Sequence, residues 1–197
     1  MNYLAHAVLS FQQPDILTGN MISDFVKGRN QYTFPVNIQK GIQLHRAIDT
    51  FTDSHPSTRE AKQLLKPASG GYSGPFIDIV FDHFLSLDAA EIPSEGWEVF
   101  SQSVYVHLES QSALLPETFK KILPYMKQHN WLANYHHIHS IEKSFQGIAR
   151  RAKFLEDALP AFRLFESEYL LLQKIYGDFF PELKEFAQTR MQELSAV

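Results

Sequence analysis

The sequence predicts an all-α protein, a single-domain helical bundle of about eight to nine helices. Segment after segment places apolar residues three or four positions apart, which is typical of helices that bury one face. No segment alternates apolar and polar residues as a half-buried strand does. Internal repeats, low-complexity tracts and long linkers are absent from the sequence, so we expect one domain over residues 1–197.

Start and stop signals divide the first half of the chain into helices and loops. Pro14 suits the first turn of a helix, and Gly28 follows a basic residue at a position where helices commonly end. Ser57 and Glu60 are spaced as a capping box, in which two side chains satisfy backbone groups at a helix start. A stretch with three Gly and two Pro closes this half as a loop. The expected order is helix 2–10, helix 14–27, loop 28–37, helix 41–53, helix 57–66 and loop 67–75.

The second half begins with a strongly amphipathic helix. Its apolar residues follow the spacing of one buried helix face, and they are Ile77, Val80, Phe81, Phe84 and Leu85. Two prolines near the C-terminal end are candidate starts or kinks of the last helix or helices. The expected order is helix 76–88, a turn over 91–95, helix 96–112, helix 116–129, a helical stretch over 130–155 with a break near His136, and one or two helices over 157–195.

Composition excludes several classes of protein. The chain has no Cys, which excludes disulfides, thiolate metal ligands and a Cys nucleophile. A formal net charge of −4 does not suggest a nucleic-acid partner. No apolar run approaches the ~20 residues of a membrane span, and we see no signal peptide, so we expect no membrane partner and a cytoplasmic location. The sequence has no G-x-S-x-G, G-x-G-x-x-G or Walker A motif.

The helix expected over 41–53 carries a row of polar residues. His45 and Asp49 are four residues apart and lie on one face, and Asp53 continues the row, displaced by about 40°. Two interpretations fit this row. Its distance from the apolar stripe of the same helix favours a solvated face, whereas imidazole beside carboxylates suits a divalent cation or a phosphate-ester reaction.

Two other expected helices carry carboxylates that need a partner. Asp24 lies in the last turn of helix 14–27, where a negative charge opposes the helix dipole and requires a cation nearby. Asp78 and Asp82 lie at the edge of the apolar stripe of helix 76–88, where partial burial of a carboxylate is unfavourable without a cation or donors. Asp78 also suits the role of an acid near a helix start, which explains Asp82 poorly.

Three helices therefore offer Asp or His side chains that are otherwise unexplained. A helical bundle that gathers such rows between facing helices makes a metal site. Carboxylates with imidazole suit Mn, Fe, Mg or Zn, and several carboxylates favour Mn or Mg. The spacing does not form a tight motif such as H-E-x-x-H.

Two further clusters concentrate positive charge or imidazole. The first cluster consists of Arg150, Arg151 and Lys153. It is either a solvated face or a binding site for phosphate or an acidic partner, for which the forked Arg side chain is well suited. The second lacks neighbouring carboxylates and is interpreted as surface or packing residues, namely His136, His137 and His139.

Short segments spread along the chain carry a family resemblance. In order they are NYLAH at 2–6, GNMISDFVKG at 19–28, GIQLHRAID at 41–49, TDSHP at 52–56, DIVFDHFL at 78–85, Trp131 and Leu132 with Tyr135, and GIARR at 147–151. Together they resemble the acyl carrier protein phosphodiesterase family, in the same order and over most of the chain.

The resemblance implies a helical fold distantly related to the HD-domain phosphohydrolases. It also implies hydrolysis, with manganese, of the phosphodiester that joins 4′-phosphopantetheine to a serine of holo acyl carrier protein, which gives apo carrier protein and free 4′-phosphopantetheine. The residues that fall on the family's acidic and histidine positions are His6, Asp24, His45, Asp49, Asp78 and Asp82. The chain departs from the family at 69–74, where a basic pair is missing, so a phosphate or carrier contact is either absent or supplied elsewhere.

We therefore predict a metal-dependent acyl carrier protein phosphodiesterase that acts on an acidic carrier protein. Mn²⁺ is the expected ion, with Mg²⁺ and Fe²⁺ as alternatives, and the six residues above are its expected ligands. The expected catalytic residues are Asp24, as a ligand or as the base that orients water, and His83. The residues expected to bind phosphate or the carrier are Arg46, Arg150 and Arg151. Two alternatives stay open: an HD-like phosphohydrolase acting on a nucleotide or another small phosphodiester, and a non-catalytic helical module that binds a carrier protein.

Overall fold

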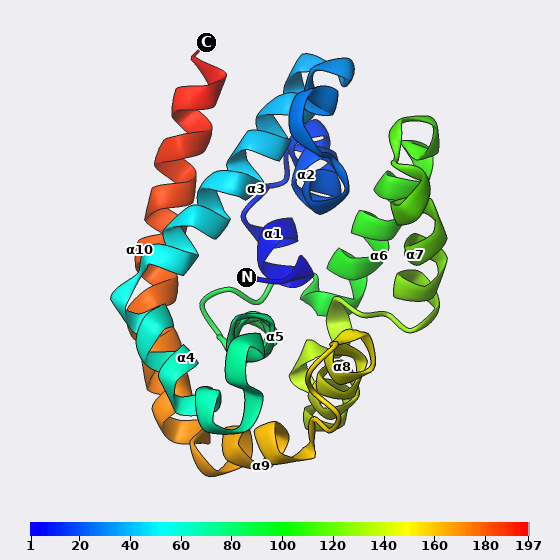
Figure 1. Ribbon diagram of the computed structural model, residues 1–197. Coiled ribbons are helices and arrows are strands. Elements are labelled where there is room, and N and C mark those ends of the chain that lie inside the picture. Colours follow the sequence, from blue (N-terminus) through cyan, green and yellow to red (C-terminus); the bar gives the residue numbers. More distant parts are fainter. Residues whose placement is uncertain (197) are drawn as a thin grey trace.

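The computed structural model describes residues 1–196 and contains, within them, ten α-helices, five 3₁₀ turns and no β-strand (Figure 1). The predicted all-α class is confirmed. The C-terminal stretch contains two helices that meet at Glu168, which is one of the two arrangements expected there. The break expected near His136 is also present, since a 3₁₀ turn ends there.

The elements follow one another with short connections. The α-helices are α1 (Tyr3–Val8), α2 (Pro14–Ile22), α3 (Val36–Ser54), α4 (Pro56–Ser69), α5 (Ser73–Leu87), α6 (Gly96–Ser110), α7 (Glu117–Gln128), α8 (Ile138–Arg151), α9 (Leu159–Ser167) and α10 (Tyr169–Ser195). The 3₁₀ turns are η1 (Ser23–Phe25), η2 (Gly28–Thr33), η3 (Gly70–Tyr72), η4 (Ser112–Leu114) and η5 (Ala133–His136). None of the described helices combines the length and the hydropathy that crossing a membrane requires.

The helix predicted over 14–27 is shorter than expected. α2 ends at Ile22, the chain tightens into η1, and Val26 then takes an extended conformation with its side chain buried. Asp24 therefore lies on η1, outside the α-helix whose dipole we expect to act on it. The loop predicted over 28–37 is partly helical as well, because η2 occupies most of it and α3 begins before its end.

The loop predicted over 67–75 is wrong in extent. α4 continues through Pro67 to Ser69, and α5 begins at Ser73 after the single turn η3. Pro67 removes only one backbone donor and lies close to the end of α4, where the loss disturbs the helix least. α4 then ends at Gly70, whose positive φ of 54° glycine adopts without strain.

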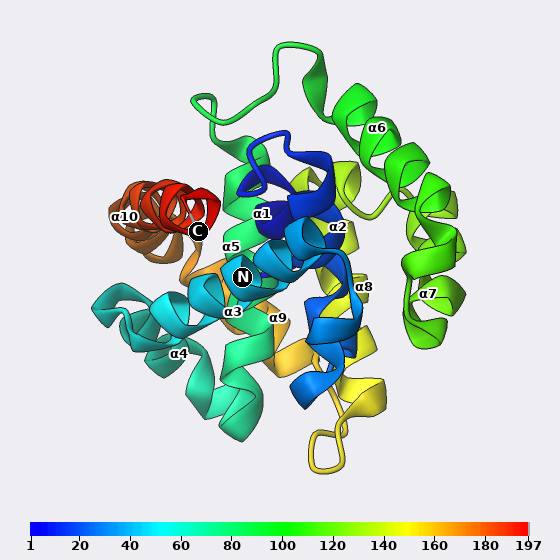
Figure 2. The ribbon, with the colours of Figure 1, turned by 90° about the horizontal axis from the view of Figure 1, so that it is seen from above.

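α5 is the central helix of the bundle. Ten of its 15 residues are buried, so it contacts neighbours on nearly every side. α1, α4, α8 and α10 pack against it, while α6 and α7 lie together at one edge of the molecule (Figures 1 and 2). Aromatic rings fill the space between these helices: the ring centroids of Phe76 and Phe145 are 4.4 Å apart, and those of Phe81 and Phe179 are 5.0 Å apart.

α2 and α3 approach each other through two glycines. A Cβ atom on Gly19 would collide with the backbone oxygen of Ile38, and one on Gly41 would collide with a backbone oxygen of α2. Because glycine has no Cβ, the two backbones meet without side chains between them. This contact brings Asn20, the next residue on α2, against α3, where His45 lies one turn after Gly41.

Candidate metal centre

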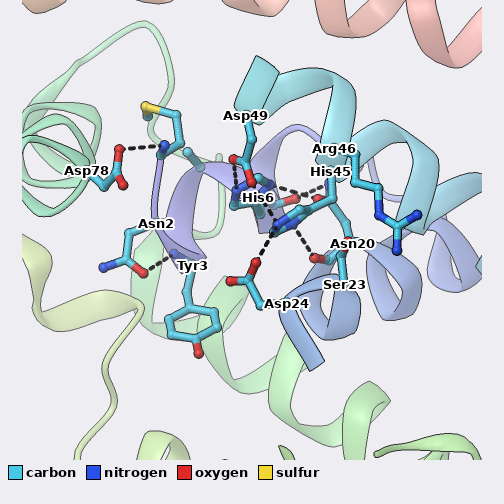
Figure 3. Close-up of polar contacts among 12 residues, drawn as sticks. Asn2, Tyr3, His6, Asn20, Ser23, Asp24, His45, Arg46, Asp49 and Asp78 are labelled. Atoms are coloured by element: carbon cyan, nitrogen blue, oxygen red, sulfur yellow. Dashed lines mark hydrogen bonds and ion pairs between the residues drawn. The ribbon is translucent and has the colours of Figure 1, made fainter. Parts of the chain in front are cut away.

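Two histidines and a carboxylate converge between α1 and α3 (Figure 3). His6 lies on α1, and His45 and Asp49 lie one turn apart on α3. The Nε2 atom of His6 is 3.3 Å from Asp49 Oδ1, and that of His45 is 3.1 Å from Asp49 Oδ2. One ligand atom from each residue lies within 4.8 Å of the other two, which is close enough for all three to reach one ion. The row predicted over helix 41–53 is therefore buried at His45, which is 5% exposed, and solvated only toward Asp53, whose side chain is 74% exposed.

Asp24 joins this cluster from the side that faces solvent. Its Oδ1 atom is 3.2 Å from His45 Nε2, so Asp24 and Asp49 share one imidazole nitrogen. The Asp24 side chain is 68% exposed, whereas that of His45 is 6% exposed. Asp24 thus lies between the buried histidines and the solvent from which a substrate arrives.

Asn20 contacts both histidines on the opposite side of their rings. Its side-chain Oδ1 atom lies 2.8 Å from His6 Nδ1, and its backbone oxygen lies 2.8 Å from His45 Nδ1. The Asn20 side chain is fully buried. No spacing pattern in the sequence identifies Asn20 as a site residue. The one available signal is its polar amide, which directly precedes apolar Met21 on a helix that is largely buried.

The charges of the cluster are coupled. Burial acts to lower the pKa of His45, but the hydrogen bonds and charges of Asp24 and Asp49 outweigh it and raise that pKa to about 9. Burial, assisted by the charge of His45, lowers the pKa of His6 to about 4. Burial acts to raise the pKa of Asp49, yet the two histidines hold it well below its usual range. The hydrogen bond from His45 likewise lowers the pKa of Asp24. Near neutral pH the cluster thus contains two carboxylates and one protonated imidazole, and its net negative charge favours a cation.

Asp78 and Asp82, on α5, hold the N-terminal segment. Asp82 accepts hydrogen bonds from the backbone N–H groups of Asn2 at 3.1 Å and Leu4 at 2.7 Å, and its charge suits the start of α1. Asp78 Oδ1 lies 2.9 Å from the amino group of Met1. Burial raises the pKa of Asp82 to about 7. The two carboxylates thereby anchor the helix that carries a histidine of the cluster, and their predicted role as metal ligands stays a prediction.

His83 faces the core of the bundle. Its Nδ1 atom lies 2.7 Å from the backbone oxygen of Tyr135, and its Nε2 atom lies 2.9 Å from the hydroxyl of Tyr169. The side chain is fully buried, and burial lowers its pKa. These partners account for a buried histidine on their own, and its predicted role in catalysis stays a prediction.

Arg46 braces the segment that precedes α3. Its guanidinium donates to the backbone oxygen of Val26 at 2.8 Å and to Gln31 Oε1 at 2.7 Å. Arg46 therefore ties η2 to α3 beside the cluster, and its predicted contact with phosphate stays a prediction.

Arg150 and Arg151 are exposed at the end of α8. The charges of Asp24 and Arg151 both act on the hydroxyl of Tyr3. Burial and the charge of Asp24 raise the pKa of Tyr3 to about 12, and the charge of Arg151 acts in the opposite direction. The predicted roles of Arg150 and Arg151 in binding phosphate or the carrier stay predictions.

Comparison with known proteins finds relatives that match most of the chain. The family model described as acyl carrier protein phosphodiesterase matches residues 1–183. Three relatives with that name cover 96% of this chain. The protein from Photorhabdus laumondii is 29% identical over 191 residues and is itself 96% covered. Those from Enterobacter sp. and Escherichia coli O6:H1 are 29% identical over 195 residues and 27% identical over 194 residues, and each is 99% covered. No solved structure matches the chain, so the relation to HD-domain proteins stays a prediction.

Proposed function

Since this chain belongs to the acyl carrier protein phosphodiesterase family, we propose that it hydrolyses the phosphodiester between 4′-phosphopantetheine and a serine of holo acyl carrier protein. Water adds across the P–O bond, the serine hydroxyl of apo carrier protein is restored, and 4′-phosphopantetheine leaves as a phosphate monoester. The proposal keeps the cytoplasmic location expected from the sequence. The observation that supports it most directly is the convergence of His6, His45 and Asp49 beneath an exposed Asp24.

The proposal includes a divalent ion held by His6, His45 and Asp49. The donor set fits such an ion, because two imidazole nitrogens and a carboxylate lie within 4.8 Å of one another. Mg²⁺ prefers an all-oxygen shell that retains water, whereas Mn²⁺ and Fe²⁺ accept imidazole readily, so Mn²⁺ is the proposed ion. When bound, such an ion would supply Lewis-acid chemistry, since it offsets phosphoryl charge and lowers the pKa of water so that a nucleophile is available near neutral pH.

Asp24 is the residue that we propose to orient the attacking water. Its lowered pKa keeps the carboxylate ionised at neutral pH, so it accepts hydrogen bonds and does not act as a general acid. Only its Oδ1 atom contacts His45, and the side chain is largely exposed. The carboxylate can therefore hold water next to the phosphodiester, either directly or as a further ligand of the ion.

Arg150 and Arg151 are proposed to attract the acidic carrier protein. Both are exposed at the end of α8, where opposite charge speeds encounter and aligns the partner. We propose that Arg46 supports the reaction mainly by ordering η2. Direct contact with phosphate is a lesser role for it, because its terminal nitrogens already donate to Gln31 and Val26.

A direct assay tests the proposed activity. The purified full chain is incubated with holo acyl carrier protein and with Mn²⁺, Mg²⁺ or Fe²⁺ in turn, and the mass of the carrier is followed. We expect conversion to the mass of apo carrier protein, fastest with Mn²⁺. A parallel panel of nucleotide phosphodiesters should show far slower hydrolysis. Failure to convert holo carrier with any of these ions, or preferred hydrolysis of a nucleotide, would overturn the proposal.

A further inference from the structure

Asn20 presents two carbonyl oxygens to two different histidines. The side-chain oxygen lies 2.8 Å from His6 Nδ1, and the backbone oxygen lies 2.8 Å from His45 Nδ1. A carbonyl oxygen can only accept a hydrogen bond, so the Nδ1 atom of each ring must be the donor. A ring that binds an ion keeps this Nδ1 proton and offers the lone pair of Nε2, the nitrogen that faces Asp49.

The orientation of the Asn20 amide follows from its other contacts. Its Nδ2 atom donates to the backbone oxygen of His6 at 2.9 Å and to Ser10 Oγ at 3.1 Å. The Ser10 hydroxyl itself donates to that backbone oxygen at 2.7 Å, so its own oxygen is free to accept. The reversed amide would set two acceptors against each other. The carbonyl group therefore faces the His6 ring.

We infer that Asn20 is a positioning residue that sets the tautomer and orientation of both rings, so that both Nε2 atoms point at one divalent ion. The inference rests on the metal site of the proposed function. It has a physical consequence for His6: with the proton on Nδ1, the lone pair of Nε2 lies next to the carboxylate of Asp49, which is unfavourable unless a cation lies between them. The arrangement therefore prepares the cluster for a cation in advance of binding.

The two contacts of Asn20 differ in kind, and this difference makes the inference testable. His6 is held by the side chain of Asn20, whereas His45 is held by its backbone, which the contact of Gly19 with Gly41 places against α3. Substitution of Asn20 therefore releases His6 alone. His45 serves as an internal control within the same molecule.

Nitrogen-15 NMR of the imidazole rings tests the inference in the wild-type chain. The spectra are recorded metal-free and with Zn²⁺, which is diamagnetic. We expect Nδ1 of both His6 and His45 to carry a proton in both conditions. A ring of either residue without a proton on Nδ1 would overturn the inference. The result does not depend on turnover, so a failure of the proposed hydrolysis is distinguished from a failure of the Asn20 role.

Asn20→Ala provides the second arm of the test. We expect His6 to lose its preference for the Nδ1-protonated tautomer, His45 to keep it, and the Mn²⁺ dissociation constant to rise by about 10- to 100-fold. Thr18→Val is the matched control, since Thr18 is equally buried on α2 but bonds to His107 at 2.9 Å. Its Mn²⁺ affinity should stay within about twofold of wild type.

Asn20→Asp separates positioning from folding. It keeps an acceptor oxygen opposite His6 and should therefore restore the Nδ1-protonated ring that Asn20→Ala loses. If Asn20→Ala does not fold, Asn20→Asp decides: an Nδ1 proton on His6 supports the inference, and its absence overturns it. A folded Asn20→Ala protein with both Nδ1 protons present and unchanged Mn²⁺ affinity would also overturn it.

Discussion

The imidazole rings of His6 and His45 stack face to face, with centroids 3.9 Å apart and 17° between the ring planes. Burial and the neighbouring ring lower the pKa of His6 to about 4, whereas Asp24 and Asp49 raise that of His45 to about 9 against the effect of burial. Near neutral pH His6 is therefore neutral, whereas His45 is protonated on both ring nitrogens. A metal ion bound at the two Nε2 atoms must displace the Nε2 proton of His45, because only deprotonated imidazole binds metal.

Metal-free protein should lose stability as the pH rises. The pKa of His45 is about 9 in the folded state and about 6.5 in the unfolded state, so the folded state binds more protons between these values. Its stabilising contribution is complete below about pH 6.5 and is lost as the pH rises through about 9. Urea unfolding of chelator-treated protein across this range measures the loss. His45→Gln should lack this part of the slope, and equal slopes for the variant and the wild type would contradict the assignment.

Asp49→Asn should abolish tight metal binding. The substitution replaces a carboxylate that both histidines contact, and we expect the Mn²⁺ dissociation constant to rise by more than about 100-fold, with hydrolysis lost in parallel. Asp53→Asn is the matched control on the same helix, because Asp53 is 74% exposed and pairs with Lys62 at 2.7 Å, away from the histidines. Calorimetric titration with Mn²⁺ compares the two variants. Equal affinities would contradict the placement of the site.

Asp82→Ala distinguishes an anchoring role from a ligand role. Without the carboxylate, buried backbone N–H groups at the start of α1 lose their acceptor, and we expect a loss of about 2–4 kcal/mol in the free energy of unfolding. Because Asp82 does not contact the histidine cluster, Mn²⁺ affinity should fall less than in Asp49→Asn. A variant of normal stability that has lost Mn²⁺ binding would instead identify Asp82 as the ligand expected from the sequence.

Gly41→Ala should separate α2 from α3. Its new methyl group would overlap a backbone oxygen of α2, and we expect a loss of about 1–3 kcal/mol in the free energy of unfolding. Gly177→Ala is the opposite case, because Gly177 lies within α10 with open space around it. There the added methyl should stabilise the protein by about 0.5–1 kcal/mol. Thermal or urea unfolding measures both changes, and equal effects would show that the close helix approach is unimportant.

Much of the fold could be predicted because helical spacing reports burial of one face. The all-α class, the central amphipathic helix and the break near His136 follow directly from such patterns. Boundaries were less accurate where local signals competed with packing. Pro67 and Gly70 mark a loop in sequence terms, yet the flanking helices bury enough surface to continue to the edge of a single turn.

The candidate site was partly predictable for a different reason. His45 and Asp49 could be paired by their spacing, since both lie on one helix. Asp24 could be singled out as a carboxylate that needs a cation nearby, and the family resemblance added His6. Asn20 could not be found in this way, because its partners lie on two other helices and one of them is held by a backbone oxygen. Contacts between separate elements leave no periodic signal in the sequence.

Restoration of activity by metal tests the central claim most directly. The full chain is treated with a chelator, dialysed and titrated with Mn²⁺, while bound Mn²⁺ and the conversion of holo to apo acyl carrier protein are measured on the same samples. We predict no conversion by the metal-free protein and a rate that rises in proportion to Mn²⁺ bound at the cluster of His6, His45 and Asp49. Full conversion by protein that holds no metal, or an unchanged rate in Asp49→Asn, would contradict this account.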